Sequence, residues 1–279
     1  MSLTENEKRV QLEALKYVKN NKKVFINKFI INKNPWPSNI LTFFMAGSPG
    51  AGKTEFSRRY VEALHRKTFS KIKEDKKIVE LFNEVGIDLK CYDRPFICID
   101  VDEIRELLPQ YKKADIKKGV SGNAHVVQRA AGCGLDIVRK YCFDNNISFL
   151  HDGTFGNQYS TMRDLIKKSL KLNREVQVFY IYADPLIAWD FTQKREYLEG
   201  RNIKREGFID QFFESMKNVD RAKTEFGKNI AVHCVLKDKK NKVEKIKFNE
   251  PSIAGFLERE YDKNSIKKYT KDDLITLLK

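Results

Sequence analysis

The sequence has few prolines, few cysteines and no long apolar run, and each shortage excludes a class of protein. Its 279 residues include seven prolines and five cysteines, and the cysteines form no CxxC pair. Scattered cysteines, odd in number, do not suit a disulfide framework or a zinc site, so we expect reduced thiols. No apolar run approaches the roughly 20 residues that span a bilayer, and the charged N-terminus lacks the apolar stretch of a signal peptide. We therefore predict a cytoplasmic protein that does not enter a membrane.

Negative charge is also scarce. Lysine and arginine number 53 against 38 aspartates and glutamates, which gives a formal charge of +15. This excess favours anionic partners, among them nucleotides, nucleic acids and acidic proteins, without choosing between them. The lysines form short clusters at residues 71–77, 112–118 and 237–247. Solvated helix faces and loops are the simplest interpretation of these clusters.

Apolar runs of strand length alternate with helical periodicity along most of the chain. Residues 40–46 are continuously apolar and precede a glycine-rich turn, as expected of a strand buried on both faces. Four further runs occupy residues 96–99, 147–150, 176–183 and 230–236. Strands that alternate with helices predict an α/β three-layer sandwich, with a mostly parallel five-stranded sheet and helices on both faces.

The length favours a single domain over residues 1–279, with additions at both ends. Residues 1–38 are predicted to form N-terminal helices, and residues 40–236 form the core. Within the core, the charged residues 67–94 are interpreted as a helical insertion. Residues 237–279 are expected to be a C-terminal extension whose last part is helical.

A complete phosphate-binding motif follows the first predicted strand. The segment GSPGAGKT matches GxxxxGK[ST] at every position. Glycines allow the backbone to turn at positive φ and to bring amide groups against phosphate oxygens, and the next helix directs its positive end at the same anions. Lys53 should reach the β- and γ-phosphates of ATP or GTP, and Thr54 should place its hydroxyl on Mg²⁺. The predicted nucleotide-binding residues are Gly47, Ser48, Pro49, Gly50, Ala51, Gly52, Lys53, Thr54 and Glu55.

Acidic residues directly follow the run at residues 96–99. Asp100 and Asp102 lie where parallel sheets bind ligands, and alternate residues of an extended chain face the same side. One of these carboxylates can accept the proton of an attacking hydroxyl, as a base does in kinases. The structural alternative is that Asp102 caps a helix that begins at Glu103.

Two further segments carry polar groups suited to a kinase. Asp152 and Thr154 follow the run at residues 147–150. Asp152 can hold Mg²⁺ through water or bind an acceptor hydroxyl, and Thr154 can donate to a substrate phosphate or sugar; an ordinary tight turn is the structural alternative. Arg195 lies on a helix that begins at Asp184-Pro185, and Arg201 and Arg205 follow it. The fixed, always charged fork of arginine suits a lid that neutralises a transferring phosphoryl group, although an exposed basic helix has the same composition. The later strands carry neither the NKxD motif of GTPases nor the Asp-Glu pair of ATPase motors, which favours a kinase.

Together these motifs resemble those of the zeta-toxin family of P-loop kinases. That family has GxPGxGKT, a strand ending in D-x-D, a strand ending in (E/D)-G-T, and a lid with two arginines. This sequence has GSPGAGKT, IDVDEIR, LHDGTFGN and the arginine segment, over residues 40–215. The resemblance implies a P-loop NTPase-type fold and transfer of phosphate from ATP or GTP, with Mg²⁺, to a sugar hydroxyl of UDP-N-acetylglucosamine. It also implies an acidic, antitoxin-like protein partner.

The resemblance also implies roles for single residues. By position, Asp102 is the catalytic base, and Lys53 acts with two lid arginines, Arg195 and either Arg201 or Arg205. The residues implied for substrate binding are Asp100, Arg105, Asp136, Asp152 and Thr154. Two of these, Asp136 and Asp152, stand where the family usually has glutamate, and relatives with this fold phosphorylate other small molecules.

Two other functions remain open. A polynucleotide 5′-hydroxyl kinase would use the charge of +15 directly, but the basic clusters contain no aromatic platform for stacking bases, so nucleic acid is a less favoured partner. A nucleotide-dependent switch protein would bind nucleotide without phosphorylating an acceptor. Its acidic partner would dock on the basic helices at residues 5–31 or 67–94.

Overall fold

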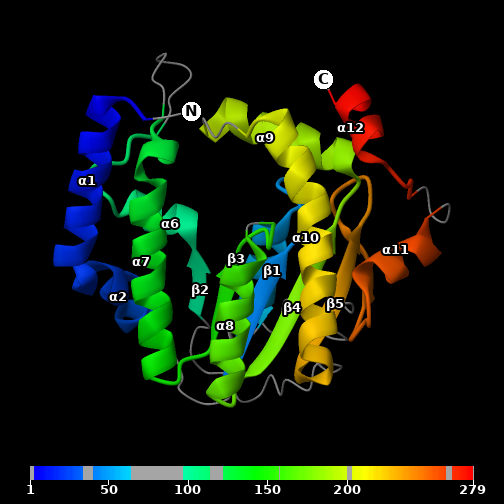
Figure 1. The fold of residues 1–279 in the computed structure, drawn as a ribbon, viewed down its shortest axis with the longest axis horizontal. Coiled ribbons are helices and arrows are strands. Elements are labelled where there is room, and N and C mark those ends of the chain that lie inside the picture. Colours follow the sequence, from blue (N-terminus) through cyan, green and yellow to red (C-terminus); the bar gives the residue numbers. More distant parts are fainter. Residues whose placement is uncertain are drawn as a thin grey trace.

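The computed structural model describes residues 3–33, 40–63, 97–113, 122–156, 158–199, 203–261 and 266–278. These residues form one sheet between helical layers (Figure 1). The predicted insertion at residues 67–94 lies outside the described residues, as does Arg201. None of the helices in the described ranges has the length and apolar character needed to cross a bilayer.

Within the described residues the sheet has six strands, in the order β2-β3-β1-β4-β5-β6. The strands are β1 (Leu41–Ala46), β2 (Ile97–Asp100), β3 (Phe149–Asp152), β4 (Glu175–Tyr182), β5 (Ile230–Lys237) and β6 (Val243–Lys247). The first five are mutually parallel and correspond to the five predicted runs. The three-layer α/β fold predicted from the alternation of strands and helices is therefore confirmed.

The sixth strand was not predicted. β6 runs antiparallel to β5 and is half-buried along most of its length, and its sequence VEKIK is rich in lysine. Lysines on an edge strand discourage pairing with another chain. The edge position of β6 therefore explains why its composition is as polar as that of a loop. The lysine cluster at residues 237–247 is thus a β-hairpin, and the sheet continues beyond residue 236.

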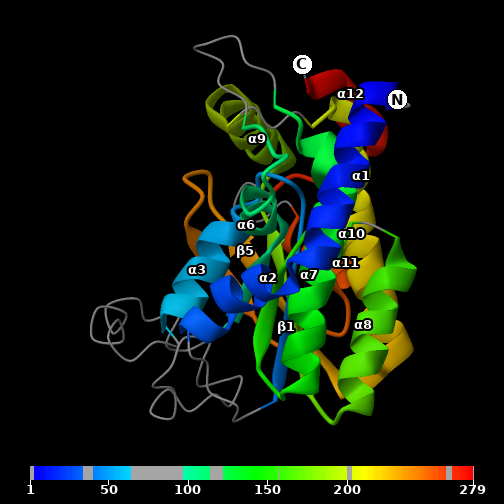
Figure 2. The ribbon, with the colours of Figure 1, turned by 90° about the vertical axis from the view of Figure 1, so that its left-hand side faces the viewer.

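Helices cover both faces of the sheet. One face carries α7 (Ala124–Asp144), α8 (Tyr159–Lys171) and α10 (Arg205–Phe226), whereas α3 (Lys53–Ala63) lies on the other (Figures 1 and 2). The N-terminal helices are α1 (Glu5–Asn20) and α2 (Lys22–Phe29), and both pack against α7. The two helices are separated at Asn21. Thr4 and Glu7 form a capping box that starts α1.

Three elements gather around the carboxyl ends of the strands. The short helix α6 (Val101–Glu106) follows β2, and α9 (Pro185–Glu199) crosses above the strand ends (Figure 1). The C-terminal helix α12 (Lys271–Leu277) contacts both α9 and α10. A further helix, α11 (Ile253–Glu260), packs against α10. This edge of the sheet carries the phosphate-binding loop, Asp100, Asp102 and Asp152.

Candidate functional site

The phosphate-binding loop connects the buried strand β1 to α3. Gly47, Gly50 and Gly52 adopt φ values of +129°, +73° and +75°, which side chains rarely tolerate. A Cβ atom at Gly50 would lie 2.0 Å from the carbonyl oxygen of Ala188 on α9. The glycines therefore permit both the turn and the close approach of α9, and the local conformation is the one expected of a phosphate loop.

Lys53 is turned back onto this loop. Its Nζ donates hydrogen bonds to the carbonyl oxygens of Gly47 (3.0 Å) and Ser48 (2.6 Å), and the residue is 9 % exposed. Burial lowers the pKa of Lys53 to about 8; the carboxylates of Asp152 and Asp100 oppose this shift, and the charge of Arg195 adds to it. An ammonium group that is held only by carbonyl oxygens is poised to exchange them for phosphate oxygens.

Asp152 is the last residue of β3 and lies against the start of α3. Ser57 donates a hydrogen bond to its Oδ2 (3.3 Å), and Thr54 also bonds its carboxylate. Burial raises the pKa of Asp152, and the charge of Lys53 and the two hydroxyl groups oppose the shift. A carboxylate and a threonine hydroxyl are the hard oxygen ligands that Mg²⁺ prefers, so Thr54 and Asp152 fit this ion. Across the described ranges no group of three or more carboxylate, histidine or cysteine side chains could hold a metal by itself, so the other ligands would be water and phosphate.

Asp100 pairs in register with Asp152 across the ends of β2 and β3. It caps α6, because its carboxylate accepts a hydrogen bond from the amide of Asp102 at 2.9 Å. Burial and the charges of Asp102 and Asp152 raise the pKa of Asp100 to about 7. The structural alternative, that Asp102 caps a helix from Glu103, is therefore wrong: the helix begins at Val101 and Asp100 is its cap.

Asp102 lies in the first turn of α6, so the expected extended alternation of Asp100 and Asp102 is also wrong. Its carboxylate forms an ion pair with Nη1 of Arg105, one turn further on. Arg105 in turn donates from Nε (3.2 Å) and Nη2 (2.6 Å) to Oε1 of Gln128 on α7. The charge of Asp102 raises the pKa of both Asp100 and Asp152, so the three carboxylates share one site at the ends of β2 and β3.

Thr154 joins the third strand end to the phosphate loop. Its carbonyl oxygen accepts a hydrogen bond from the amide of Gly47 at 3.1 Å. Its hydroxyl oxygen accepts one from the amide of Gly156 at 3.2 Å. The segment Asp152-Gly153-Thr154 therefore forms a tight turn, and this turn contacts the phosphate loop.

The arginine segment divides between two places. Arg195 lies on α9, the helix that packs on the phosphate loop at Gly50, and its charge contributes to the lowered pKa of Lys53. Arg205 begins α10, donates to the carbonyl oxygen of Leu278 (3.3 Å) and pairs with Glu206 (3.3 Å). The structure thus brings Arg195 to the phosphate loop, whereas Arg205 contacts the C-terminal segment.

Asp136 lies apart from the carboxylate cluster. It occupies the middle of α7, its side chain is 68 % exposed, and it forms an ion pair with Arg139 of the same helix. Arg139 is itself buried, and its charge contributes to the low pKa of His151, which burial holds at about 3. His151 is thus a neutral, buried residue.

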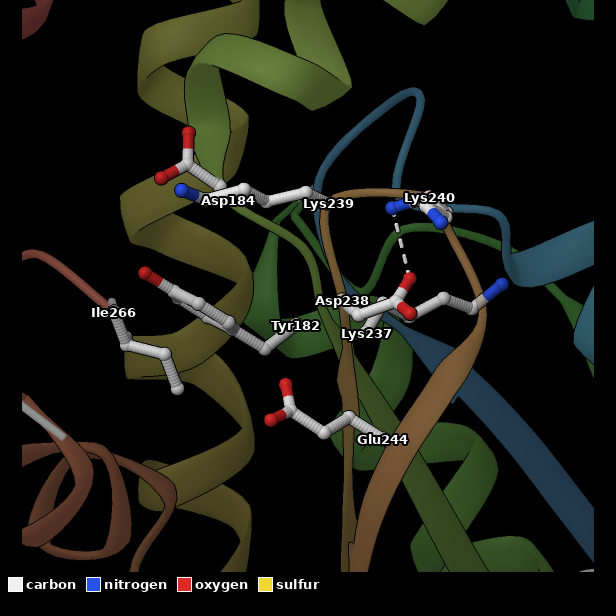
Figure 3. A pocket seen from close by; sticks show the side chains of 8 residues that line it. All are labelled: Tyr182, Asp184, Lys237, Asp238, Lys239, Lys240, Glu244 and Ile266. Carbon is white, nitrogen blue, oxygen red and sulfur yellow. Dashed lines mark hydrogen bonds between the residues drawn. The ribbon is translucent and has the colours of Figure 1, made fainter. Parts of the chain in front are cut away.

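A cavity of about 340 Å³ opens beside the phosphate loop (Figure 3). It lies between the end of β4, the β5–β6 hairpin and the C-terminal segment. Its lining residues are Tyr182, Asp184, Lys237, Asp238, Lys239, Lys240, Glu244 and Ile266. The C-terminal segment also bonds this region, because the hydroxyl of Tyr269 donates to Oδ2 of Asp184 at 3.3 Å.

The sequence profile of the zeta toxin family matches residues 87–250, more than half of the chain. The chain belongs to the zeta toxin family. Family membership and the complete phosphate-binding motif make it a P-loop kinase, a phosphotransferase that uses a nucleotide as donor. The matched residues include the carboxylates of β2 and β3 and the helix α9.

Solved structures share the fold of this zeta-toxin family member. The structure of the PezAT chromosomal toxin-antitoxin system of Streptococcus pneumoniae matches with a TM-score of 0.52 at 14 % identity, over 99 % of this chain and 94 % of that chain. The structure of AvrRxo1-ORF1:-ORF2 with ATP matches with a TM-score of 0.50 at 11 % identity, over 94 % of this chain and 74 % of that chain. Likeness at these identities concerns the fold alone. No curated protein sequence matches the chain.

One residue of this zeta-toxin site was missed by sequence reasoning. Lys237, the last residue of β5, was assigned to a solvated cluster, but it is 6 % exposed and its Nζ donates to the carbonyl oxygen of Gly52 at 3.3 Å. Its Nζ also lies 3.8 Å from the carboxylate of Glu55, which was predicted to bind nucleotide. The sequence did contain a signal for the burial of Lys237, because this lysine ends an apolar strand. The exposed lysines that follow it made the whole segment resemble a solvated cluster.

Proposed function

We propose that this zeta-toxin family kinase transfers the γ-phosphate of ATP or GTP to a hydroxyl group of a nucleotide sugar, with UDP-N-acetylglucosamine as the first acceptor to test. The observation that carries the proposal is the arrangement at the ends of β2 and β3, where Asp100 and Asp152 are paired in register and the amide of Asp102 donates to the Asp100 carboxylate. Asp152 also accepts a hydrogen bond from Ser57 of α3, the helix that Lys53 begins. A carboxylate and an ammonium group that face one site suit the two tasks of phosphoryl transfer, proton removal and charge neutralisation.

In this proposal each group has one task. Asp102 accepts the proton of the acceptor hydroxyl on its carboxylate, and the ion pair with Arg105 fixes the direction of that carboxylate. Lys53 leaves the carbonyl oxygens of its own loop and binds the β- and γ-phosphate oxygens, while Arg195 approaches from α9. Thr54 and Asp152 would hold Mg²⁺, which draws charge away from the transferring phosphate when bound.

Donor and acceptor are assigned to opposite sides of the phosphate loop. The nucleoside of the donor would occupy the cavity at the ends of β4 and β5, where Tyr182 and Ile266 provide apolar surface and Asp184 provides a hydrogen-bond acceptor. The acceptor would lie over β2 and β3, near Thr154. Because the amide of Gly156 occupies the hydroxyl oxygen of Thr154, its O–H is left to donate to an acceptor oxygen.

A protein partner is part of the proposal. The matched structures are described as a toxin-antitoxin system and as a complex of two open reading frame products. The charge of +15 on this chain would suit an acidic partner. We infer that such an antitoxin-like protein restrains the kinase, which a pull-down from cells at low and high salt would test through loss of the partner at high salt.

The decisive experiment is a transfer assay with Mg·ATP or Mg·GTP and a panel of UDP-sugars, in which mass spectrometry detects gain of one phosphoryl group. The panel includes an oligonucleotide with a 5′-hydroxyl, so that a nucleic-acid kinase would be recognised. We expect Asp102→Asn to lower kcat by about 10²–10⁴-fold while nucleotide binding persists. The control is Asp164→Asn, which changes an exposed carboxylate on α8. Unchanged turnover in Asp102→Asn would reject the assigned base, and nucleotide binding without any phosphorylated acceptor would favour a switch protein.

A further inference from the structure

The turn after β3 contains a bulky residue in an unfavourable backbone conformation. Phe155 has φ = +59°, in the left-handed region that large side chains rarely occupy, and it is 3 % exposed. Such a conformation persists only where the surroundings hold it, and it is found most often at functional sites. The neighbouring Thr154 belongs to the candidate site, so the contacts that hold Phe155 matter for that site.

Two groups hold Phe155 in place. Nδ2 of Asn218, on α10, donates a hydrogen bond to the carbonyl oxygen of Phe155 at 3.0 Å. The Phe155 ring packs edge-on against Phe44 of β1, with 6.1 Å between ring centroids. Asn218 is 4 % exposed, so this hydrogen bond is protected from competing water.

The conformation of Phe155 determines where the oxygens of Thr154 point. On one side of Phe155, the carbonyl oxygen of Thr154 meets the amide of Gly47. On the other side, the amide of Gly156 meets the hydroxyl oxygen of Thr154. If Phe155 relaxed to a negative φ, the amide of Gly156 would turn with it and both contacts would change together.

We propose that Asn218 is a positioning residue of the kinase site: it fixes the carbonyl of Phe155, and thereby sets Thr154 against the phosphate loop and orients its hydroxyl. α10, which follows the lid helix α9 in the chain, is in this way connected to the acceptor side of the site. The role in phosphoryl transfer rests on the proposed function, whereas the connection from Asn218 to Gly47 does not.

The test uses Asn218→Asp, which keeps the shape of the side chain and replaces the donor with a second acceptor. The first readout needs no activity: hydrogen exchange of the Gly47 and Gly156 amides, measured by NMR on the full chain. Because the carboxylate repels the carbonyl of Phe155, we expect both amides to exchange at least about tenfold faster relative to amides of β5. The matched control is Ser215→Ala, a fully buried position one turn earlier on α10, whose hydroxyl bonds the carbonyl oxygen of Phe212 and the hydroxyl of Tyr180 on β4.

The second readout is kinetic. With Mg·ATP and UDP-N-acetylglucosamine, we expect Asn218→Asp to lower kcat by about 10–100-fold, because a small misplacement of a contact group has this effect. The Kd for Mg·ATP should change by less than about threefold, because the amides at Gly50–Thr54 that cradle the phosphates stay in place. A residue with only a structural role would alter both quantities through lost folded protein.

Each outcome decides the proposal. The proposal is overturned if the Gly47 amide of Asn218→Asp exchanges at the rate of the unaltered protein. It is also overturned if Ser215→Ala accelerates exchange at Gly47 equally, because the acceleration would then reflect a loss of helix stability. If Asn218→Asp does not fold, Asn218→Ala removes the donor without adding charge and carries the same expectation. Absence of transfer by the unaltered protein would count against the proposed function, whereas faster exchange at Gly47 would still support the connection.

Discussion

Lys237 and Gly52 are joined across the end of the sheet: Nζ of Lys237 donates a hydrogen bond to the carbonyl oxygen of Gly52 at 3.3 Å. The same ammonium group donates to the carbonyl oxygen of Asn241 at 3.2 Å. Burial lowers the pKa of Lys237, and the carboxylate of Glu55 opposes the shift. Two buried lysines thus flank the phosphate loop, with Lys53 on its inner side and Lys237 supporting it from β5.

This support predicts the effect of Lys237→Met, which keeps much of the apolar stem and removes the donor. The carbonyl oxygen of Asn241, which is partly buried, would lose this donor, whereas that of Gly52 would keep its hydrogen bond from the amide of Phe56. The expected cost is about 1 kcal/mol. We expect Mg·ATP affinity, measured by calorimetry, to fall by about tenfold, and the melting temperature to fall as well. Lys242→Met, an exposed lysine on the same hairpin, is the control. Equal affinities in the two variants would show that the hairpin does not support the loop.

Two glycines with opposite surroundings predict opposite results of the same substitution. At Gly50, φ is +73° and a Cβ would lie 2.0 Å from a backbone oxygen of α9, so Gly50→Ala must displace the loop or the helix. At Gly132, within α7, a Cβ would meet no atom within 4 Å. We expect Gly50→Ala to abolish nucleotide binding and lower the melting temperature. Gly132→Ala should stabilise the protein by about 0.5–1 kcal/mol and leave binding intact.

For both variants, thermal unfolding with and without Mg·ATP measures the stability and the nucleotide binding. A nucleotide-induced rise in melting temperature that survives in Gly50→Ala would contradict the close packing of α9 on the phosphate loop.

The pKa of Lys53, about 8, predicts proton uptake when nucleotide binds. Near pH 8.5 the Lys53 side chain would be neutral in about three quarters of the protein molecules before binding, and the phosphates of the bound nucleotide would favour its charged form. Calorimetry in two buffers of different ionisation enthalpy should therefore show uptake of a fraction of a proton. Lys53→Met should remove this uptake, and uptake of the same size in that variant would assign the proton elsewhere.

The same pKa has a consequence for stability. The folded-state pKa lies below the value of 10.5 for an unperturbed lysine. Below about pH 8 both states hold the proton, and the folded protein bears the full cost of the buried charge. Between about pH 8 and 10.5 the folded state loses its proton first, so this residue makes stability rise with pH there. The contribution should be absent from the pH dependence of unfolding in Lys53→Met.

If the nucleoside occupies the cavity beside β4 and β5, a substitution in this cavity should weaken binding of ATP but not of a phosphate chain that has no base. Ile266 lines this cavity and is 9 % exposed. Truncation in Ile266→Ala removes apolar contact worth about 1–2 kcal/mol, so ATP affinity should fall by about 5–30-fold. Affinity for inorganic tripolyphosphate, which has no base, should stay within about twofold. Ile275→Ala, which truncates a 42 % exposed isoleucine of α12, is the control.

Loss of ATP and tripolyphosphate affinity in equal measure would place the nucleoside elsewhere.

The carboxylate cluster illustrates what sequence reasoning can and cannot supply. The positions of Asp100, Asp102 and Asp152 at strand ends were predictable, because an apolar run followed by an acid marks the end of a strand. The division of roles between Asp100 and Asp102 was not, because it depends on whether the chain leaves β2 in an extended or a helical conformation. The helix begins at Val101, and the cap therefore falls on Asp100.

The arginine segment and the hairpin show the same limit. Arg195 and Arg205 are equally basic in sequence, and only the packing of the C-terminal segment against α10 shows that Arg205 binds the carbonyl oxygen of Leu278. Lys237 and its neighbour Lys239 are likewise indistinguishable by composition, yet the first is buried and the second is exposed. Composition therefore predicted the charge of these segments and not the contacts of single side chains.

The sequence by itself determined the phosphate loop, the five parallel strands and the membership of the zeta toxin family, because these depend on local spacing and on continuous apolar runs. Only the tertiary structure decided which charged groups meet at the phosphate loop. Lys53 and Asp152 are 99 residues apart in the chain, and Asp152 and Lys237 are 85 residues apart. They converge because the strand order β3-β1-β4-β5 brings the ends of those strands to one edge, and the periodicity of a chain does not encode that order.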